Sequence, residues 1–514
     1  MDVAPKTIRQ YRLEADSLGE VRVPASALYG VQTQRAIDNF PITGVRISHY
    51  PEFVKALAAI KKAAAMANER MGLLDEPRSR AIREACDLIM AGKHRGHFRV
   101  DVIQGGAGTS SNMNANEVIA NLALELMGHT RGDYDFLHPN NHVNLSQSTN
   151  DVYPSAIRLT LVIMGQALHK AMGRLAGALE DKGQEFAHVI KIGRTQLQDA
   201  VPMTLGQEFR AWALMVREDR QRLLEALDLV REINLGGTAI GTGINAPPEY
   251  APLVVALLNQ VSGQGMILAE NLVEATQDAG AYVQFSGVLK RTAVKLSKIC
   301  NDLRLLSSGP RCGLGEIRLP KMAPGSSIMP GKVNPIIPEV VNQIAFQVIG
   351  SDLTVTMAAE AGQLELNAME PVLAHNLFNS LLLLRRGCLV LADKCVKGIE
   401  ADEERCRHNV EQSLGLATAL CPYIGYDAAS RIAQHAARES LSVRDAAQAI
   451  LGWDDARLAE VLNPENMLTP VEPRREYVCF TSDRHEDRAG DVPPGITVNA
   501  AAADSSTDKS RTTA

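Results

Sequence analysis

The chain has 514 residues, 46% of them hydrophobic and 22% charged, with a formal net charge of −6 at pH 7. This is ordinary globular composition, enough for a large core and about three domains. An acidic chain lacks the overall basic charge typical of nucleic-acid-binding proteins, although a local basic cluster can still attract a small anion.

Membrane and disulfide signals are weak in this sequence. No apolar run reaches the ~18 residues of a membrane span, and the first residues lack the apolar core of a signal peptide. The eight cysteines show neither CxxC nor zinc-ligand spacing, which favours free thiols in a reducing compartment. We therefore expect a cytoplasmic protein that binds neither nucleic acid nor a membrane.

The first 147 residues are mixed but mainly helical, with a short β-like start and an alanine-rich helix near 52–71. Two polar segments stand out, QGGAGTSSNMNANEV from Gln104 and QSTNDVYP from Gln147. Both lie at apparent helix starts, where helix capping is their ordinary role. Neutral donors at helix N-termini also suit carboxylate binding.

Long helices dominate the middle of the chain. Apolar residues recur at steps of three and four through 204–235 and 288–309. Similar patterns cover roughly 154–188, 337–360 and 366–398. Five helices of such length, each near 40 Å, must pack side by side, so a bundle is predicted, with further packing between subunits. A third polar segment, GRTQLQDAVPMTLGQEF, is also expected at a helix start.

The segment GSSIMPGKVNP, from Gly325, invites comparison with a phosphate-binding loop. Aligning its Gly-Lys pair places Ser326 at the first glycine of that motif and Val333 at its hydroxyl residue, so the motif fails. Glycines and prolines instead indicate an exposed loop. Serine can act as a base when backbone N–H groups and an ammonium stabilise its oxyanion. Taken alone, the loop could equally be solvated surface; with the other polar segments it indicates a pocket for a small polyanion.

After about residue 404 the helical patterns become shorter, and from 481 the composition turns polar and loses its apolar stripe. The final segment is therefore predicted to be disordered. We expect four parts: an N-terminal mixed, mainly helical domain at 1–147, a central helix bundle at 148–403, a small helical domain at 404–480 and a disordered tail at 481–514.

GSSIMPGKVNP closely resembles the signature of the aspartase/fumarase superfamily, and the resemblance extends to about residue 470. VDVIQGGAGTSSNMNANEV, EATQDAGAYV and VTMAAEAGQLELNAMEPV are similar to the aspartate ammonia-lyase branch. Gln196 stands where fumarases and some aspartases have a histidine, which counts against fumarase. The resemblance implies a mostly α, three-domain fold whose central bundle joins three others in a homotetramer with a twenty-helix core. Each active site would then draw residues from three subunits.

The resemblance implies reversible elimination of ammonia from L-aspartate to give fumarate through a C3 carbanion. Ser326 would be the base, and Lys332 would stabilise the serine oxyanion or a substrate carboxylate. Glu339 would be structural, because Gln196 replaces its usual histidine partner. The implied substrate-binding residues are Thr109, Ser148, Thr149, Asn150, Thr195, Gln196, Lys332 and Asn334.

No cofactor is required by the resemblance, which allows Mg²⁺ as an activator but points to no metal site. It names no general acid for the departing ammonia. Three alternatives stay open: a class II fumarase, a lyase acting on a modified aspartate, and a catalytically silent relative.

Overall fold

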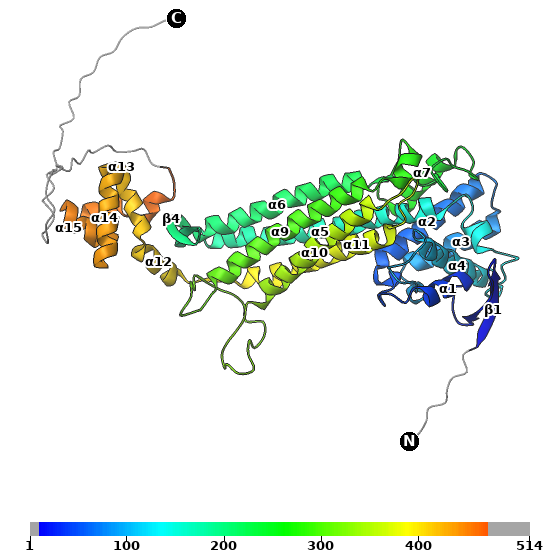
Figure 1. Ribbon diagram of the computed structural model, residues 1–514, viewed down its shortest axis with the longest axis horizontal. Coiled ribbons are helices and arrows are strands. Elements are labelled where there is room, and N and C mark those ends of the chain that lie inside the picture. The colour runs from blue at the N-terminus through cyan, green and yellow to red at the C-terminus, as the bar shows by residue number, and fades with distance from the viewer. Residues whose placement is uncertain (1–9, 471–514) are drawn as a thin grey trace, which may run out of the picture. The chain divides into compact units, whose positions relative to one another are not determined.

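The computed structural model describes residues 10–470 (Figure 1). The described chain is mostly helical, as predicted, and divides into two compact units. Unit 1 contains the chain up to Gly177, Leu214–Asn301 and Ile336–Lys394; unit 2 contains Ala178–Ala213, Asp302–Pro335 and the chain from Cys395. The four predicted parts of the chain stay predictions, and the tail at 481–514 lies outside the described residues.

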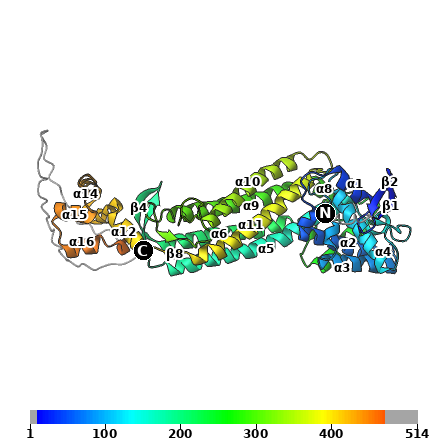
Figure 2. The ribbon, with the colours of Figure 1, turned by 90° about the horizontal axis from the view of Figure 1, so that it is seen from below.

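Five long helices form the bundle predicted from the apolar periodicity, and they run side by side, mostly in unit 1 (Figures 1 and 2). The stripe on the third of them is confirmed, since Leu289, Leu296 and Leu303 are buried. Burying one such side chain stabilises the fold by about 1.5–3 kcal/mol. The helices are α5 (Thr149–Glu185), α6 (Leu205–Leu229), α9 (Gly280–Leu306), α10 (Ile336–Glu360) and α11 (Glu370–Lys394).

The stripe predicted for 204–235 is partly wrong, because α6 ends at Leu229. Ile233 is buried, but it lies on the short strand β5 (Glu232–Ile233), which pairs in parallel with β6 (Ile267–Leu268). The start of α6 is set by a capping box, in which the Thr204 hydroxyl accepts the Gln207 N–H at 3.0 Å and the Gln207 side chain accepts the Thr204 N–H at 2.9 Å.

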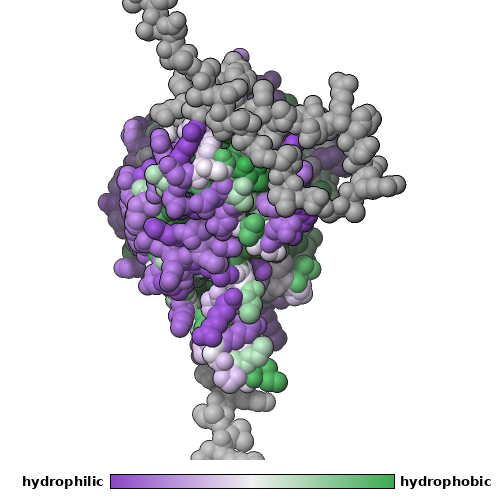
Figure 3. Space-filling view, turned by 90° about the vertical axis from the view of Figure 1, so that its left-hand side faces the viewer, coloured by the Kyte–Doolittle hydropathy of each residue, from purple (hydrophilic) through white to green (hydrophobic). Residues whose placement is uncertain are grey.

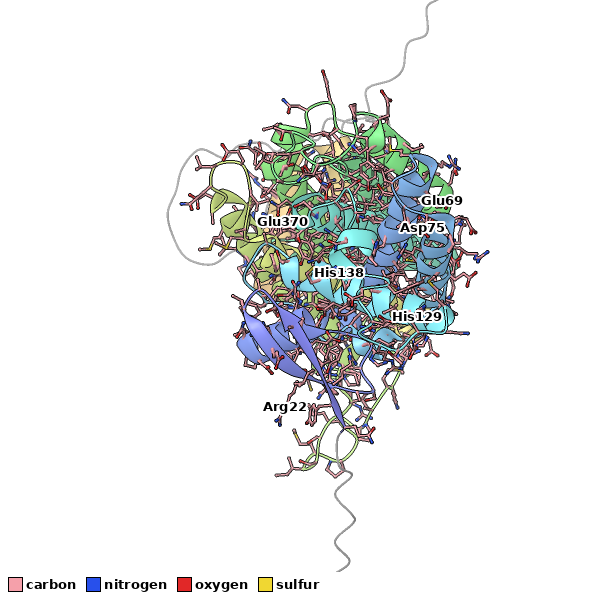
Figure 4. The ribbon with its side chains drawn as sticks, turned by 90° about the vertical axis from the view of Figure 1, so that its right-hand side faces the viewer. Arg22, Glu69, Asp75, His129, His138 and Glu370 are labelled. Atoms are coloured by element: carbon pink, nitrogen blue, oxygen red, sulfur yellow. The ribbon has the colours of Figure 1, made fainter. Side chains whose placement is uncertain are left out.

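One end of unit 1 carries the N-terminal elements, viewed in Figure 4 with Arg22 and His138 labelled. The alanine-rich helix predicted near 52–71 is confirmed as α2, which begins at a proline and is largely buried. The elements here are the antiparallel pair β1 (Tyr11–Asp16) and β2 (Gly19–Pro24), with α1 (Val31–Asn39), α2 (Pro51–Arg70), α3 (Glu76–Met90), α4 (Thr109–Leu126), α7 (Tyr250–Ser262) and α8 (Leu272–Gln277).

Unit 2 has its own small core, in which Ile432, Trp453 and Leu458 are buried together. The face turned to the viewer in Figure 3 is mainly hydrophilic, with small apolar areas between. Its elements are the antiparallel pairs β3 (Ile190–Thr195) with β4 (Gln198–Thr204) and β7 (Ile317–Arg318) with β8 (Glu400–Ala401), then α12 (Glu403–Gln412), α13 (Cys421–Ile424), α14 (Tyr426–Glu439), α15 (Val443–Leu451) and α16 (Asp455–Val461).

Between residues 10 and 470, none of the helices combines the length and apolar character needed to cross a bilayer.

Candidate active site

A glycine-rich loop leads into α4 and presents Thr109. Gly106, Ala107 and Gly108 have φ angles of 90°, 52° and 88°, in the left-handed region that glycine adopts most readily. A Cβ on Gly108 would lie 2.3 Å from the Tyr153 ring, so only glycine fits there. Thr109 is exposed, and its hydroxyl donates to the Gly106 carbonyl at 2.7 Å. The loop therefore presents Thr109 at the surface, while the N–H groups of Thr109 and Ser111 donate to the Gly106 carbonyl at 2.9 Å and to Gln104 Oε1 at 3.0 Å.

The start of α5 is held by reciprocal hydrogen bonds. The Ser148 hydroxyl accepts the Asn150 N–H at 3.2 Å, and the Ser148 N–H donates to Asp151 Oδ1 at 2.9 Å. Asp151 is fully buried, and its other oxygen accepts the N–H groups of Gly236 and Thr238. Burial raises the pKa of Asp151 to about 6, although these backbone donors oppose the rise.

A buried polar network joins the starts of α4 and α5. Asn112 Nδ2 donates to Thr149 Oγ1 and to Asn144 Oδ1, both at 3.1 Å. Lys61, buried on α2, donates to Asn144 Oδ1 at 2.8 Å and to Gln147 Oε1 at 2.9 Å. Burial lowers the pKa of the Lys61 ammonium to about 7. The structure therefore brings the two N-terminal polar segments together, and Asn112 and Lys61 are the residues that do it.

The third polar segment differs from its prediction. The expected helix start at Thr195 is wrong, because β3 and β4 form a hairpin and α6 begins only at Leu205. Gln196 and Leu197 form the two-residue turn, with φ angles of 55° and 62°. Two successive positive φ angles suit Asn-Gly far better than Gln-Leu, so the turn stores backbone strain. Thr195 and Gln196 are therefore exposed at a strained tip.

The Ser326 loop is closed on itself by backbone bonds. The Gly325 N–H donates to the Lys332 carbonyl at 2.8 Å, and Asn334 Nδ2 donates to the Gly325 carbonyl at 2.9 Å. Ser326 Oγ accepts the N–H groups of Ile328 at 3.2 Å and Met329 at 2.9 Å. Two donors aimed at one hydroxyl oxygen are the arrangement that would stabilise an alkoxide there.

The Ser326 loop also exposes one charged and two apolar side chains. The Lys332 side chain is exposed and has no hydrogen-bond or ion-pair partner among residues 10–470. Ile328 is 83% exposed and Met329 is 50% exposed, in the same loop as Lys332. An exposed cation and an exposed apolar rim suit a surface that becomes covered by a ligand or another chain.

The predicted site residues lie in two groups. In the described part of the chain, no hydrogen bond or ion pair joins the hairpin tip to the Ser326 loop. Unit 1 holds Thr109, Ser148, Thr149 and Asn150, and unit 2 holds Thr195, Gln196, Ser326, Lys332 and Asn334.

Two buried residues that contact the N-terminal polar segments were missed by sequence reasoning. Lys61 lies in AAIKKAAAM, where a lysine on the apolar face of a helix was a usable signal. Nothing in the sequence singled out Asp151, because acidic residues are common in the first turn of a helix.

Mg²⁺, which the resemblance allows as an activator, finds no ready ligand set here. Within residues 10–470, no group of three or more His, Cys, Asp or Glu side chains is arranged to hold a metal ion. We therefore derive no step through Mg²⁺.

Two family models match the chain. The one described as "Lyase" matches residues 19–350, which include every predicted site residue. The chain belongs to this lyase family. A second model, described as "Fumarase C C-terminus", matches residues 416–469. The resemblance to the aspartase/fumarase superfamily is thereby confirmed.

Individual members of this lyase family are similar to the chain over most of its length. Aspartate ammonia-lyase of Pseudomonas canavaninivorans is 59% identical over 461 residues, covering 90% of this chain and 97% of the relative. Aspartate ammonia-lyase of Escherichia coli K12 is 50% identical over 467 residues, covering 91% and 98%.

Solved structures agree with the mostly α fold. A fumarate lyase:delta crystallin from Brucella melitensis, bound to cobalt, is 58% identical with a TM-score of 0.88, covering 90% of this chain and all of that one. A class II fumarase from Schistosoma mansoni is 37% identical with a TM-score of 0.85, covering 89% of this chain and 99% of that one. The predicted aspartase/fumarase fold is confirmed for the subunit; the twenty-helix core of a tetramer stays a prediction.

Proposed function

We propose that this lyase eliminates ammonia reversibly from L-aspartate to give fumarate. Relatives named aspartate ammonia-lyase, 50–59% identical over about nine-tenths of the chain, support this carbon–nitrogen lyase activity. The residue at 196 agrees, because an amide replaces the histidine found in fumarases. The structural observation that carries the chemistry is Ser326 Oγ, which accepts two backbone N–H groups.

The serine would act as the base. Its alkoxide, formed when the hydroxyl releases its proton to solvent, takes the proton from C3, and the electron pair of the C–H bond moves into the adjacent β-carboxylate, giving a dianionic aci-form. That pair then forms the C2–C3 double bond while the C–N bond breaks. The ammonium leaves as neutral NH₃ with the C–N electron pair, so this step needs no general acid. Donors that tighten on the growing charge lower the barrier.

The remaining residues would bind and orient the substrate. Lys332, charged at neutral pH in its ordinary state, would stabilise the serine oxyanion or a substrate carboxylate. Thr109, at the start of α4, would turn its hydroxyl from the Gly106 carbonyl to the substrate, at a helix N-terminus where anions are favoured. The other residues proposed to bind carboxylate and amino groups are Ser148, Thr149, Asn150, Thr195, Gln196 and Asn334.

The Ser326 loop is proposed to close over the substrate. Gly331 has a φ of 82° with open space around it, and Gly325 is tightly packed against the Lys332 carbonyl. Gly331 would therefore be the freer hinge, while the bond between Gly325 and Lys332 keeps the loop a single body. Closure of such a lid excludes water from the carbanion.

We further propose a homotetramer whose active sites are each shared by three subunits. Phe346, Ile349, Leu353 and Met357 follow steps of three and four on α10, so they share one face. Phe346 and Leu353 are each 63% exposed and Met357 is 64% exposed. An exposed apolar stripe of this length supports burial against another copy of the chain. The cytoplasmic location expected from the sequence stays a prediction.

A direct assay tests the proposed activity. Purified protein is offered L-aspartate and then L-malate while fumarate is followed by ultraviolet absorbance. We expect fumarate from L-aspartate. Fumarate from L-malate alone would identify a class II fumarase, and fumarate from neither would favour a modified aspartate as substrate or a silent relative.

A further inference from the structure

A fully buried carboxylate, Glu316, lies in unit 2 directly before β7. Its Oε1 accepts Arg194 Nη2 at 2.7 Å and Asn409 Nδ2 at 3.1 Å, and its Oε2 pairs with Lys191 Nζ at 3.3 Å. Burial raises the pKa of Glu316, but the hydrogen bond from Arg194 and the charges of Lys191 and Arg194 outweigh it and leave the pKa below its ordinary value. The carboxylate is therefore ionised although it is out of contact with water.

The backbone of Glu316 is fixed as well. Its N–H donates to the Leu306 carbonyl at 2.9 Å, where α9 ends, and its carbonyl accepts the Asp402 N–H at 2.9 Å, just before α12. Glu316 thus fixes the chain that leads, ten positions later, to Ser326.

Lys191 and Arg194 both reach Glu316 from β3, at a point where the hairpin is irregular. Lys191 and Arg194 are three positions apart, and side chains at odd spacing on a regular strand point to opposite faces. The register of β3 against β4 shifts between Ile192 and Arg194. Ile192 pairs with Pro202 and Arg194 with Asp199, so β4 has one residue more than β3 at this point, and such a bulge increases the local twist of the hairpin. Lys191 Nζ also donates to Glu208 Oε2 at 2.9 Å, so two carboxylates share this ammonium. Arg194 has its buried contact with Glu316.

Arg194 directly precedes Thr195 and the strained turn at Gln196. A two-residue turn with unfavourable residues keeps its conformation only when its flanking strands are held firmly. The Arg194 side chain is 14% exposed and forms the last buried contact before the exposed tip.

We propose that Glu316 and Arg194 are positioning residues: their ion pair fixes the direction of the Thr195–Gln196 tip against the chain that carries Ser326. This inference rests on the proposed function, because it describes how that function's substrate-binding turn is held. The alternative is an ion pair that only stabilises unit 2.

The test compares Glu316→Gln, Arg194→Gln and the double variant with a matched control. Asp219 is the control, since it is a buried carboxylate with two cations, Arg291 at 2.8 Å and Lys295 at 2.9 Å, on bundle helices. We measure KM and kcat for L-aspartate, the thermal midpoint, and amide hydrogen exchange of residues 190–204 by mass spectrometry.

We expect Glu316→Gln to raise KM about tenfold and to lower kcat/KM by up to about a hundredfold, because small misplacements of binding groups have effects of this size. Exchange in the hairpin should become faster. The double variant should regain thermal stability relative to Arg194→Gln, because Lys191 keeps its ion pair with Glu208 and no buried charge is left unpaired, while its KM stays raised. Asp219→Asn should lower the thermal midpoint and leave KM unchanged.

Two outcomes would overturn the positioning role: hairpin exchange in Glu316→Gln that matches the wild type, or a double variant whose KM recovers together with its stability. If Glu316→Gln does not fold, Arg194→Lys, which keeps the charge but loses the planar fork, takes its place. Wild-type hairpin exchange in Arg194→Lys would then overturn the role in the same way. If the proposed function is wrong, the wild type makes no fumarate from L-aspartate. Hydrogen exchange of residues 190–204 would still show whether the ion pair holds the hairpin.

Discussion

At the scale of single residues, the Ser326 loop shows how an exposed segment can hold a hydroxyl group in place. Backbone donors from Ile328 and Met329 converge on the Ser326 oxygen, and a backbone bond closes the loop between Gly325 and Lys332. Backbone donors need no side-chain rotamer to be ordered, so an exposed loop can still be preorganised.

Replacing Ser326 with alanine removes the proposed base. We expect Ser326→Ala to lower kcat by about 10³-fold or more, within the range known for general bases, while the oligomer remains intact. Fumarate formation and light scattering measure the two quantities. Ser327→Ala is the matched control, because its neighbouring hydroxyl has no role in the proposal. Near-normal turnover in Ser326→Ala would show that another group removes the proton.

Lys332 is expected to act on the substrate more than on the fold. Its side chain is exposed, so Lys332→Ala should leave thermal stability within about 0.5 kcal/mol of the wild type. The affinity of Lys332→Ala for a non-reacting aspartate analogue, measured by calorimetry, should fall at least tenfold. Lys321→Ala, an exposed lysine earlier in the same segment, is the control. Unchanged analogue affinity in Lys332→Ala would contradict the proposed role.

At the scale of elements, one helix begins with a buried carboxyl group and another has an exposed apolar face. Glu370 is the first residue of α11, yet it is buried, and its Oε2 lacks a hydrogen-bond partner within residues 10–470 (labelled in Figure 4). Burial raises the pKa of Glu370 to about 8, although the charge of Arg158 opposes the rise. The carboxyl is therefore protonated at neutral pH in the folded chain.

This raised pKa predicts how stability depends on pH. Between the ordinary value of 4.5 and about 8, the folded chain holds a proton at Glu370 that the unfolded chain has lost. Its contribution to the free energy of unfolding is complete below pH 4.5 and disappears as pH rises to about 8. Glu370→Gln should remove this dependence, becoming more stable relative to wild type at pH 8 than at pH 5 by at least about 1 kcal/mol. A difference between the two proteins that is constant with pH in urea unfolding would show that Glu370 is ionised throughout.

The exposed apolar face of α10 makes a separate prediction about assembly. Leu353→Glu should place a charge within the proposed interface and dissociate the tetramer, with loss of activity because the sites are shared. Mass photometry measures the oligomer. Leu73→Glu is the control, since Leu73 is also exposed, at 48%, but lies in the turn after α2. A Leu353→Glu tetramer with full activity would remove α10 from the interface.

At the scale of the whole molecule, the site residues lie in two units of the chain, which fits active sites assembled from several subunits. Two inactive variants should then complement each other. Thr149→Val and Ser326→Ala chains, unfolded together and refolded, should regain up to about a quarter of wild-type activity, because a shared site can draw each segment from an intact chain. Either variant refolded alone is the control, and a mixture no more active than these would place the whole site in one subunit.

Much of the fold followed from periodicity, because long amphipathic helices repeat one signal many times. The stripe at Leu289, Leu296 and Leu303 is buried as predicted. The hairpin before α6 was missed, because its strands are short and its turn has Gln-Leu in place of the usual Asn-Gly. Local sequence could not reveal that Glu316 holds this hairpin, since their contact joins residues more than a hundred positions apart.

The sequence predicts candidate site residues where a polar cluster is itself the signal, as at Ser148–Asn150. Lys61 and Asp151 were not predicted, because their contacts depend on burial, which composition does not report. A buried lysine looks like any other helix former in a sequence.

The turn at Gln196 and Leu197 has a consequence for selection experiments. Glycine adopts a positive φ with far less strain than leucine, so Leu197→Gly is a stabilising change available by substitution at one position. A screen for heat resistance would retain that variant, and Gln196→Asn with it. Under the proposed function the second change would shorten the amide that meets the substrate. Variants selected only for survival at high temperature should therefore carry substitutions in this turn and have lower turnover. Sequences selected for catalysis should keep the strained Gln196 and Leu197.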